Sequence, residues 1–402
     1  MTPSAIVPVG SDEPRATPVA STSEVGSLVE TDRAVASALY NALAEEADGN
    51  VFFSPYSIIL AFSMVEAGAN ANTEDQLRTA LGITGDDDEW HASRNTLDQT
   101  LTAPVEIPDG AEPLTLRINN SPFAQAGFTF EQDYLDLLAT DYGAGLQTVD
   151  YVSDPDGARV AINKQVADET EDRITELLPE GSINSDVRLT LVNTIFFEGN
   201  WVTEFNPALT EPGSFTTSGG VVVEPDMMHT NVRTTFGTGS GWSAVKLPYW
   251  GGYTMNVIVP DVDRFDEIEA MIGSGLLDEV RAIESDNAVA LTMPKFSFGS
   301  DADLAPVLSS LGVDDLFDPI AADLSGMTAQ ARLFASGAFH QATIEIDENG
   351  TVAAAATAVV IGITSAPVPA ELVVDRPFIV AIEHDLTGEI LFLGRVLDPT
   401  AS

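Results

Sequence analysis

Cysteine is absent from this chain of 402 residues, and basic residues are scarce. Without cysteine there can be no disulfide, no thiol nucleophile and no cysteine-based metal site. Lys and Arg together number 17 against 62 Asp and Glu, which gives a formal net charge of −45. A surface of this sign repels the phosphates of nucleic acids and of anionic membranes. We therefore expect no nucleic-acid partner.

Long apolar runs are also missing. No segment reaches the roughly 18 consecutive apolar residues of a membrane-spanning helix, so no membrane span is predicted. The pattern of a secretory signal, a basic segment followed by an apolar one, is not visible at the N-terminus. Residues 1–26 are rich in Pro, Ser, Thr, Val and Ala without periodicity, and we interpret them as a flexible tail or linker.

High net charge often indicates disorder, but 44% of these residues are hydrophobic and helix and strand patterns run along the chain. We interpret the charge as that of a folded, salt-adapted protein, from a source of haloarchaeal type. Molar salt shortens the Debye length to about 3 Å and screens the repulsion between acidic groups. No interior linker divides the chain, so residues 27–402 are predicted to form a single domain.

Motifs of common enzymes are not found either. The chain has four histidines and contains no G-x-S-x-G, P-loop, H-E-x-x-H or G-x-G-x-x-G pattern. The acidic run at 86–89 fits a solvated surface better than a cation site in so acidic a chain. We predict no catalytic residue, no metal and no cofactor, and hence a protein that is not an enzyme.

The order of the predicted elements indicates an α+β fold. Ser54 and Pro55 fit the N-cap and the first position of a helix that is apolar on most sides and should be buried. A β-rich run at 189–201 fits a central strand, and residues 376–399 fit a hairpin. Helices precede strands without regular βαβ alternation, which favours α+β over α/β.

One stretch near the C-terminus combines opposite preferences. In "ENGTVAAAATAVVIGITSAP" (348–367), four alanines favour a helix, whereas Thr357, Val359, Val360 and Ile361 prefer a strand. A helix would not suit the second half of this stretch, and an ordinary strand would not suit the first.

The chain resembles the serpin family from about residue 28 to residue 400. The matching segments, in the order and close to the spacing of the family, are "NVFFSPYSI", "LVNTIFFEGNW", "MPKFSF", "IEIDENGTVAAAATA", "DRPFIVAI" and "GEILFLGRV". The resemblance implies a serpin fold with about nine helices, three β-sheets and an exposed reactive-centre loop near the C-terminus.

The resemblance also implies inhibition of serine-type endopeptidases by suicide-substrate trapping. A protease cuts the loop, and the upstream part of the loop inserts into the central sheet as a new strand while the protease is still attached. The loop hinge corresponds to Gly350, Thr351, Ala353, Ala354, Ala355, Ala356 and Thr357. Their small, uncharged side chains favour an inhibitor, and the alternative is a non-inhibitory serpin acting as a binding or chaperone-like module.

Two further groups of residues match family sites. Ser54, Ser57, Asn193 and His340 match the "shutter", a hydrogen-bond cluster under the centre of the sheet. Trp201, Lys295 and Glu348 match the "breach", where insertion starts, and a Lys295–Glu348 ion pair is predicted to help hold the loop out. The role of His340 is expected to be conformational, not catalytic.

The family spacing places the reactive bond between Thr364 and Ser365. Because the loop is about two residues longer than in common members, cleavage after Ile363, Ser365 or Ala366 stays open. All of these residues are small or apolar, so the expected target is a subtilisin-like, elastase-like or chymotrypsin-like protease and not a trypsin-like one. Family resemblance implies an extracellular monomer, with a cytoplasmic location as the alternative.

Overall fold

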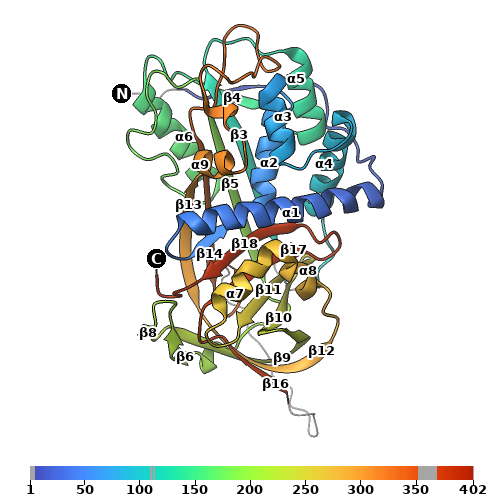
Figure 1. The fold of residues 1–402 in the computed structure, drawn as a ribbon, viewed down its shortest axis with the longest axis vertical. Coiled ribbons are helices and arrows are strands. Elements are labelled where there is room, and N and C mark those ends of the chain that lie inside the picture. The colour runs from blue at the N-terminus through green and yellow to red at the C-terminus, as the bar shows by residue number, and fades with distance from the viewer. Residues whose placement is uncertain (1–4, 109–110, 112–113, 352–368, 402) are drawn as a thin grey trace.

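The computed structural model describes residues 5–108, 111, 114–351 and 369–401 (Figure 1). The described residues form nine α-helices: α1 Thr22–Glu46, α2 Pro55–Glu66, α3 Ala71–Ala80, α4 Asp87–Leu101, α5 Gln132–Leu137, α6 Pro155–Glu169, α7 Phe265–Ala270, α8 Leu276–Arg281 and α9 Leu304–Ser310. None of them is long and apolar enough to cross a membrane.

Seven strands form the main sheet, in which the order is β1-β4-β3-β5-β15-β14-β13. Their bounds are β1 Val7–Val9, β3 Thr115–Gln125, β4 Leu146–Val149, β5 Leu189–Asn200, β13 Phe296–Asp303, β14 Ala338–Ile346 and β15 Gly350–Thr351. The long strands β5 and β14 stand at its centre, on either side of β15.

Two further sheets share the long strand β9. One contains β9 Asp226–Gly239, β10 Trp242–Tyr249, β11 Tyr253–Pro260, β17 Phe378–His384, β18 Ile390–Val396 and β2 Val51–Phe53. The other joins β9 to β6 Glu211–Pro212, β12 Asp286–Pro294 and β16 Ala370–Val373. A small pair, β7 Phe215–Thr216 and β8 Val222–Val223, lies beside them. The predicted α+β architecture, with about nine helices and three sheets, is confirmed over the described residues.

Helix α2 packs against strands of two sheets, and its sequence explains how it begins and why it is buried. Ser54 caps it by accepting a hydrogen bond from the backbone N–H of Ser57, and Pro55 occupies the first turn, where its missing N–H leaves no bond unmade. Every residue from Pro55 to Glu66 is buried, as the all-round apolar pattern predicts. The helix packs on β3, β5 and β18 and so lies directly beneath the centre of the main sheet.

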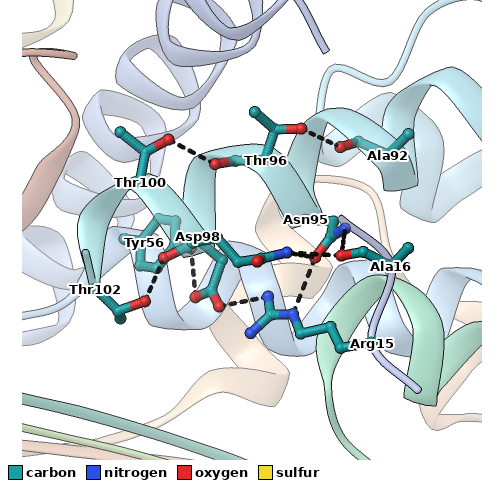
Figure 2. Close-up of polar contacts among 10 residues, drawn as sticks. Arg15, Ala16, Tyr56, Ala92, Asn95, Thr96, Asp98, Thr100 and Thr102 are labelled. Atoms are coloured by element: carbon teal, nitrogen blue, oxygen red, sulfur yellow. Dashed lines mark hydrogen bonds and ion pairs between the residues drawn. The ribbon is translucent and has the colours of Figure 1, made fainter. Parts of the chain in front are cut away.

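Residues 5–26 take part in the fold, whereas the sequence predicted a flexible tail or linker over residues 1–26. β1 pairs with β4 at the edge of the main sheet, and α1 begins at Thr22 behind a Ser21 capping box. Between them Arg15 binds Asp98 of α4 at 2.6 Å and Asn95 at 2.9 Å (Figure 2). A short strand and an extended segment have no periodicity, so their docking was not visible in the sequence.

Candidate functional site

The centre of the main sheet has an unusual arrangement of three strands. β5 and β14 run parallel and pair directly over only part of their length, with Leu191 to Thr194 opposite Ala338 to Gln341. At the other end β15 lies between them and runs antiparallel to both, with Thr351 opposite Gly199 of β5 and Ile346 of β14. At one end of the main sheet β5 and β14 therefore pair directly, and we call this the closed end. At the other end, the open end, the two residues of β15 lie between them.

A buried polar cluster lies beneath the closed end. It brings together the four residues that were matched to the shutter, Ser54, Ser57, Asn193 and His340. The backbone N–H of Ser54 donates to Nε2 of His340 at 3.1 Å, and the hydroxyl of Ser57 donates to Oδ1 of Asn193 at 2.8 Å. The other ring nitrogen of His340, Nδ1, also bonds Oδ1 of Asn193. These bonds link α2, β5 and β14 in one network.

The network fixes the protonation state of His340. Because Nε2 accepts the N–H of Ser54, the ring proton sits on Nδ1 and is donated to Asn193. Burial lowers the pKa of His340 to about 3, so the ring is neutral under ordinary conditions. A buried neutral imidazole with both nitrogens engaged has no free group for acid–base chemistry, which agrees with a conformational role.

A second polar group lies at the open end, where Lys295 and Glu348 form the predicted ion pair. Nζ of Lys295 lies 2.8 Å from Oε2 of Glu348, and the hydroxyl of Thr210 donates to Oε1 at 2.7 Å. The hydrogen bond to Glu348 raises the pKa of Lys295. For Glu348, partial burial opposes ionisation, but the bonds from Lys295 and Thr210 outweigh it and lower its pKa. The carboxylate is thus held ionised and fixed.

Trp201, the third residue matched to the breach, holds the backbone that precedes the hinge. Its indole N–H donates to the carbonyl of Asp347 at 3.1 Å, and its backbone N–H donates to the carbonyl of Asn349 at 2.8 Å. Phe205 adds a bond from its N–H to the carbonyl of Glu348 at 2.8 Å. The segment 347–349 is therefore anchored residue by residue.

A tight turn follows, and it reverses the chain into the sheet. The carboxylate of Asp347 accepts the N–H groups of Asn349 at 2.8 Å and Gly350 at 3.1 Å, and the N–H of Asp347 donates to the carbonyl of Gly350. A Cβ on Gly350 would lie 2.1 Å from the carbonyl oxygen of Gly199, so the close approach of β5 requires glycine there. The hinge residues Ala353, Ala354, Ala355, Ala356 and Thr357 and the bond Thr364–Ser365 lie outside the described residues.

Several residues that complete these groups were missed from the sequence. Asp347 has a local signal, because an Asp shortly before Asn-Gly is typical of a turn. Asn120, which accepts a bond from the side-chain amide of Asn193, and Thr210 have none, since their partners are distant in the sequence. Tyr249, whose hydroxyl bonds Thr351, was also missed for this reason.

Only one group of acidic residues in the described ranges has the spacing of a metal site. Ligand atoms of Glu66, Glu74 and Asp87 lie within 4.8 Å of one another. The guanidinium of Arg78 already binds between two of them, 3.2 Å from Glu66 and in contact with Asp87. Because this arginine already supplies a positive charge to two of the three carboxylates, the group does not by itself indicate a bound cation.

Together the fold and the site define an α+β protein whose chain begins to enter its own main sheet beside a buried polar cluster. A family model described as "Serpin (serine protease inhibitor)" matches residues 30–399, and the chain belongs to the serpin family. Serpins are generally protease inhibitors and not catalysts.

Relatives and solved structures agree with this assignment. The chain is 34% identical to the leukocyte elastase inhibitor of Bos taurus over 362 residues, which cover 87% of this chain and 93% of the relative. It is similar to the native state of the thermophilic serpin Tengpin, with a TM-score of 0.83, 25% identity, and coverage of 97% and 99%. A complex of thyroxine-binding globulin with thyroxine gives a TM-score of 0.84, 26% identity, and coverage of 93% and 100%.

Proposed function

We propose that this protein inhibits serine proteases as a suicide substrate, and that the segment following Thr351 inserts between β5 and β14 after cleavage. The observation that carries the proposal is the position of Gly350 and Thr351. They already lie between the two central strands, antiparallel to both and in register with them. A strand that continues from Thr351 in this direction would run toward the closed end of the main sheet.

The sequence beyond Thr351 suits such an insertion. Residues 353–356 are alanines, whose small side chains need little rearrangement of β5 and β14 at the first steps. Thr357, Val359, Val360 and Ile361 then prefer a strand. At about 3.3 Å a residue, the segment from Gly350 to Thr364 extends about 50 Å, which suffices to cross the main sheet.

Insertion would also have to pass the closed end, which gives the buried cluster its proposed role. The direct pairs between β5 and β14 include Asn193 opposite His340, and the side chains of these two residues bond each other. A strand that passes between them must break this bond and the backbone pairs around it. We assign Ser54, Ser57, Asn193 and His340 to the shutter on this ground, and Trp201, Lys295 and Glu348 to the breach because they fix the segment where insertion starts.

For the target, we propose an elastase-like, chymotrypsin-like or subtilisin-like protease that cuts between Thr364 and Ser365. A cut after Ile363, Ser365 or Ala366 is the alternative, and each of these residues is small or apolar. The relative named leukocyte elastase inhibitor supports a target of this class. Of these three protease classes we propose the subtilisin-like one first, because a salt-adapted, extracellular monomer would encounter a subtilisin-like exoprotease.

A second function is favoured by one structural neighbour. Thyroxine-binding globulin has the same fold and was solved with thyroxine bound, so the fold also supports ligand binding. A non-inhibitory serpin needs no loop insertion, whereas an inhibitor does. The small residues at 353–356 favour the inhibitor.

The deciding experiment mixes the protein with a subtilisin-like and an elastase-like protease in multimolar salt. A complex that survives denaturing electrophoresis, together with a released peptide that begins near Ser365, would establish inhibition and locate the bond. Ala353→Arg should abolish the complex and leave a cleaved substrate, because a long charged side chain enters the sheet poorly. Ala321→Arg, at an exposed alanine outside the loop segment, is the matched control and should leave the complex intact.

Clean cleavage without a complex leads to a second measurement. A large rise in thermal stability of the cleaved protein would show that the loop inserts and that the tested protease was the wrong one. Cleavage without any rise would contradict the inhibitory mechanism and favour the binding function.

A further inference from the structure

Tyr249, the last residue of β10, contacts the hinge from a different sheet. Its hydroxyl lies 2.7 Å from Oγ1 of Thr351, and either group can be the donor. Both side chains are buried, with 2% of Tyr249 and 3% of Thr351 exposed. Burial raises the pKa of Tyr249 far above its ordinary value, so the hydroxyl keeps its proton.

The tyrosine ring is fixed by its aromatic neighbours. It stacks on Trp201 with ring centroids 4.3 Å apart and an interplanar angle of 21°. Phe197 of β5 meets it edge-on at 5.1 Å. A ring held on two sides presents its hydroxyl at one defined place, which is the position of the Thr351 side chain.

Trp201 and Tyr249 therefore bind the chain before and after the turn that leads into the hinge. Trp201 binds the carbonyls of Asp347 and Asn349 before the turn. Tyr249 binds the side chain of Thr351 after it. Between them, the carboxylate of Asp347 closes the turn itself.

We propose that Tyr249 is a positioning residue for the loop hinge, and that its bond to Thr351 keeps that residue in the main sheet as the first pair of the inserted strand. Ordering the first residues of a strand costs conformational entropy, and here this ordering precedes any contact with a protease. Insertion of the strand then begins from a residue, Thr351, that is already paired in the main sheet. The kinetic consequence rests on the proposed function, but the placement of the hinge does not.

Four single variants test the role of this hydroxyl pair. Tyr249→Phe keeps the aromatic stack and removes only the hydroxyl, Thr351→Val keeps the side-chain shape, and Thr351→Ser keeps the hydroxyl. Tyr253→Phe is the matched control, because Tyr253 is also buried but donates its hydroxyl to the carbonyl of Leu101 at 2.6 Å.

The first measurement is amide hydrogen exchange of residues 347–351 in the free protein. Exchange should become about fivefold faster in Tyr249→Phe and in Thr351→Val, the factor expected for losing one neutral buried hydrogen bond. The double variant should show no further increase, and Thr351→Ser and Tyr253→Phe should match the unchanged protein. Unchanged exchange in Tyr249→Phe, or effects that add in the double variant, would overturn the inference. If Tyr249→Phe does not fold, the contrast between Thr351→Val and Thr351→Ser decides.

The second measurement is the number of inhibitor molecules consumed per protease trapped. It should rise in Tyr249→Phe and Thr351→Val, since a detached hinge inserts later and more acyl-enzyme is hydrolysed first. It should not change in Tyr253→Phe. The expected exchange pattern in a protein that traps no protease would support this inference and contradict the proposed function. If the protein traps a protease but the exchange effects of Tyr249→Phe and Thr351→Val are absent or additive, the proposed function is supported and this inference is contradicted.

Discussion

His340 of β14 donates from Nδ1 to Oδ1 of Asn193 of β5, and this hydrogen bond crosses the boundary between the two strands that insertion would separate. Asn193 also accepts the hydroxyl of Ser57 and donates to Asn120, so one amide joins α2, β3, β5 and β14. Replacing Asn193 with Ala would remove the partner of Nδ1 of His340 and of the Asn120 side-chain oxygen, and one of the two acceptors of the Ser57 hydroxyl.

We expect His340 to make stability depend on pH in the acid range. Its pKa is lowered to about 3 in the folded protein, whereas an unfolded histidine titrates near pH 6.5. As pH falls from about 6.5 toward 3, only the unfolded state gains the proton, so stability falls by up to about 1.4 kcal/mol per pH unit. Above pH 7 this contribution is constant.

The measurement is the free energy of unfolding against pH for the unchanged protein and for His340→Gln. The variant should be less stable at pH 7 but should lose less stability between pH 6 and 4. Parallel curves would show that His340 is not held neutral. Carboxylates titrate in both proteins and therefore cancel in the difference.

Removing the Lys295–Glu348 ion pair should loosen the start of the loop more than it lowers global stability. The side chains are 36% and 10% exposed, so we expect Lys295→Met or Glu348→Gln to cost no more than about 1 kcal/mol of unfolding free energy. The rate of spontaneous conversion to a loop-inserted, inactive form should rise, because this pair is predicted to hold the loop out, whereas the Tyr249–Thr351 bond holds Thr351 in the main sheet.

Lys164→Met is the control for that prediction. Lys164 pairs with Asp168 on the surface of α6, with side chains 69% and 64% exposed, and lies away from the hinge. Conversion is followed at 37 °C through loss of inhibition and gain of thermal stability. If Lys164→Met accelerates conversion as much as Lys295→Met, net charge and not this pair is responsible.

Gly350→Ala should expel the hinge from the main sheet. The added Cβ would approach the carbonyl oxygen of Gly199 to 2.1 Å and Cα of Asn200 to 2.8 Å, and both are backbone atoms of a central strand. We expect a loss of about 1–3 kcal/mol and a shift from inhibitor toward substrate. Gly85→Ala, at a turn glycine with open space around its Cα, reports the cost of a new side chain at positive φ alone. Equal behaviour of the two variants would exclude the contact with β5 as the cause.

Glu389, at the turn before β18, should destabilise the fold as pH rises. Burial, followed by the nearby carboxylate of Asp32, raises its pKa well above the ordinary value, although Arg94 opposes this. A raised carboxyl pKa means stability that is present at low pH and is lost as pH rises above the unfolded pKa. Glu389→Gln should therefore be more stable than the unchanged protein at neutral pH, with the difference shrinking below pH 4. Chemical denaturation at pH 4 and pH 8 measures it, and a less stable variant at pH 8 would refute the assignment.

The fold and the two polar groups of the site could be predicted because their residues sit in segments with family-like patterns. Ser54 and Pro55 also carry a helix-start signal of their own, and Asn349-Gly350 a turn signal. Tyr249 could not be found this way, since its partner Thr351 is distant in sequence and a tyrosine that ends a strand is unremarkable locally. The docking of residues 5–21 was missed for the related reason that Arg15 finds Asp98 only in the folded protein.

The parallel pairing of β5 and β14 has a consequence for the energy of the whole molecule. Both neighbouring pairs of long strands, β3–β5 and β13–β14, are antiparallel, so β5–β14 is a parallel pair between antiparallel ones. Parallel ladders are slightly weaker per residue than antiparallel ones. A strand that enters at Thr351 would replace this one parallel pairing with two antiparallel pairings, one to β5 and one to β14. The folded protein thus keeps its main sheet one strand short of a fully antiparallel centre, and under the proposed function the chain that continues from Thr351 would supply that strand.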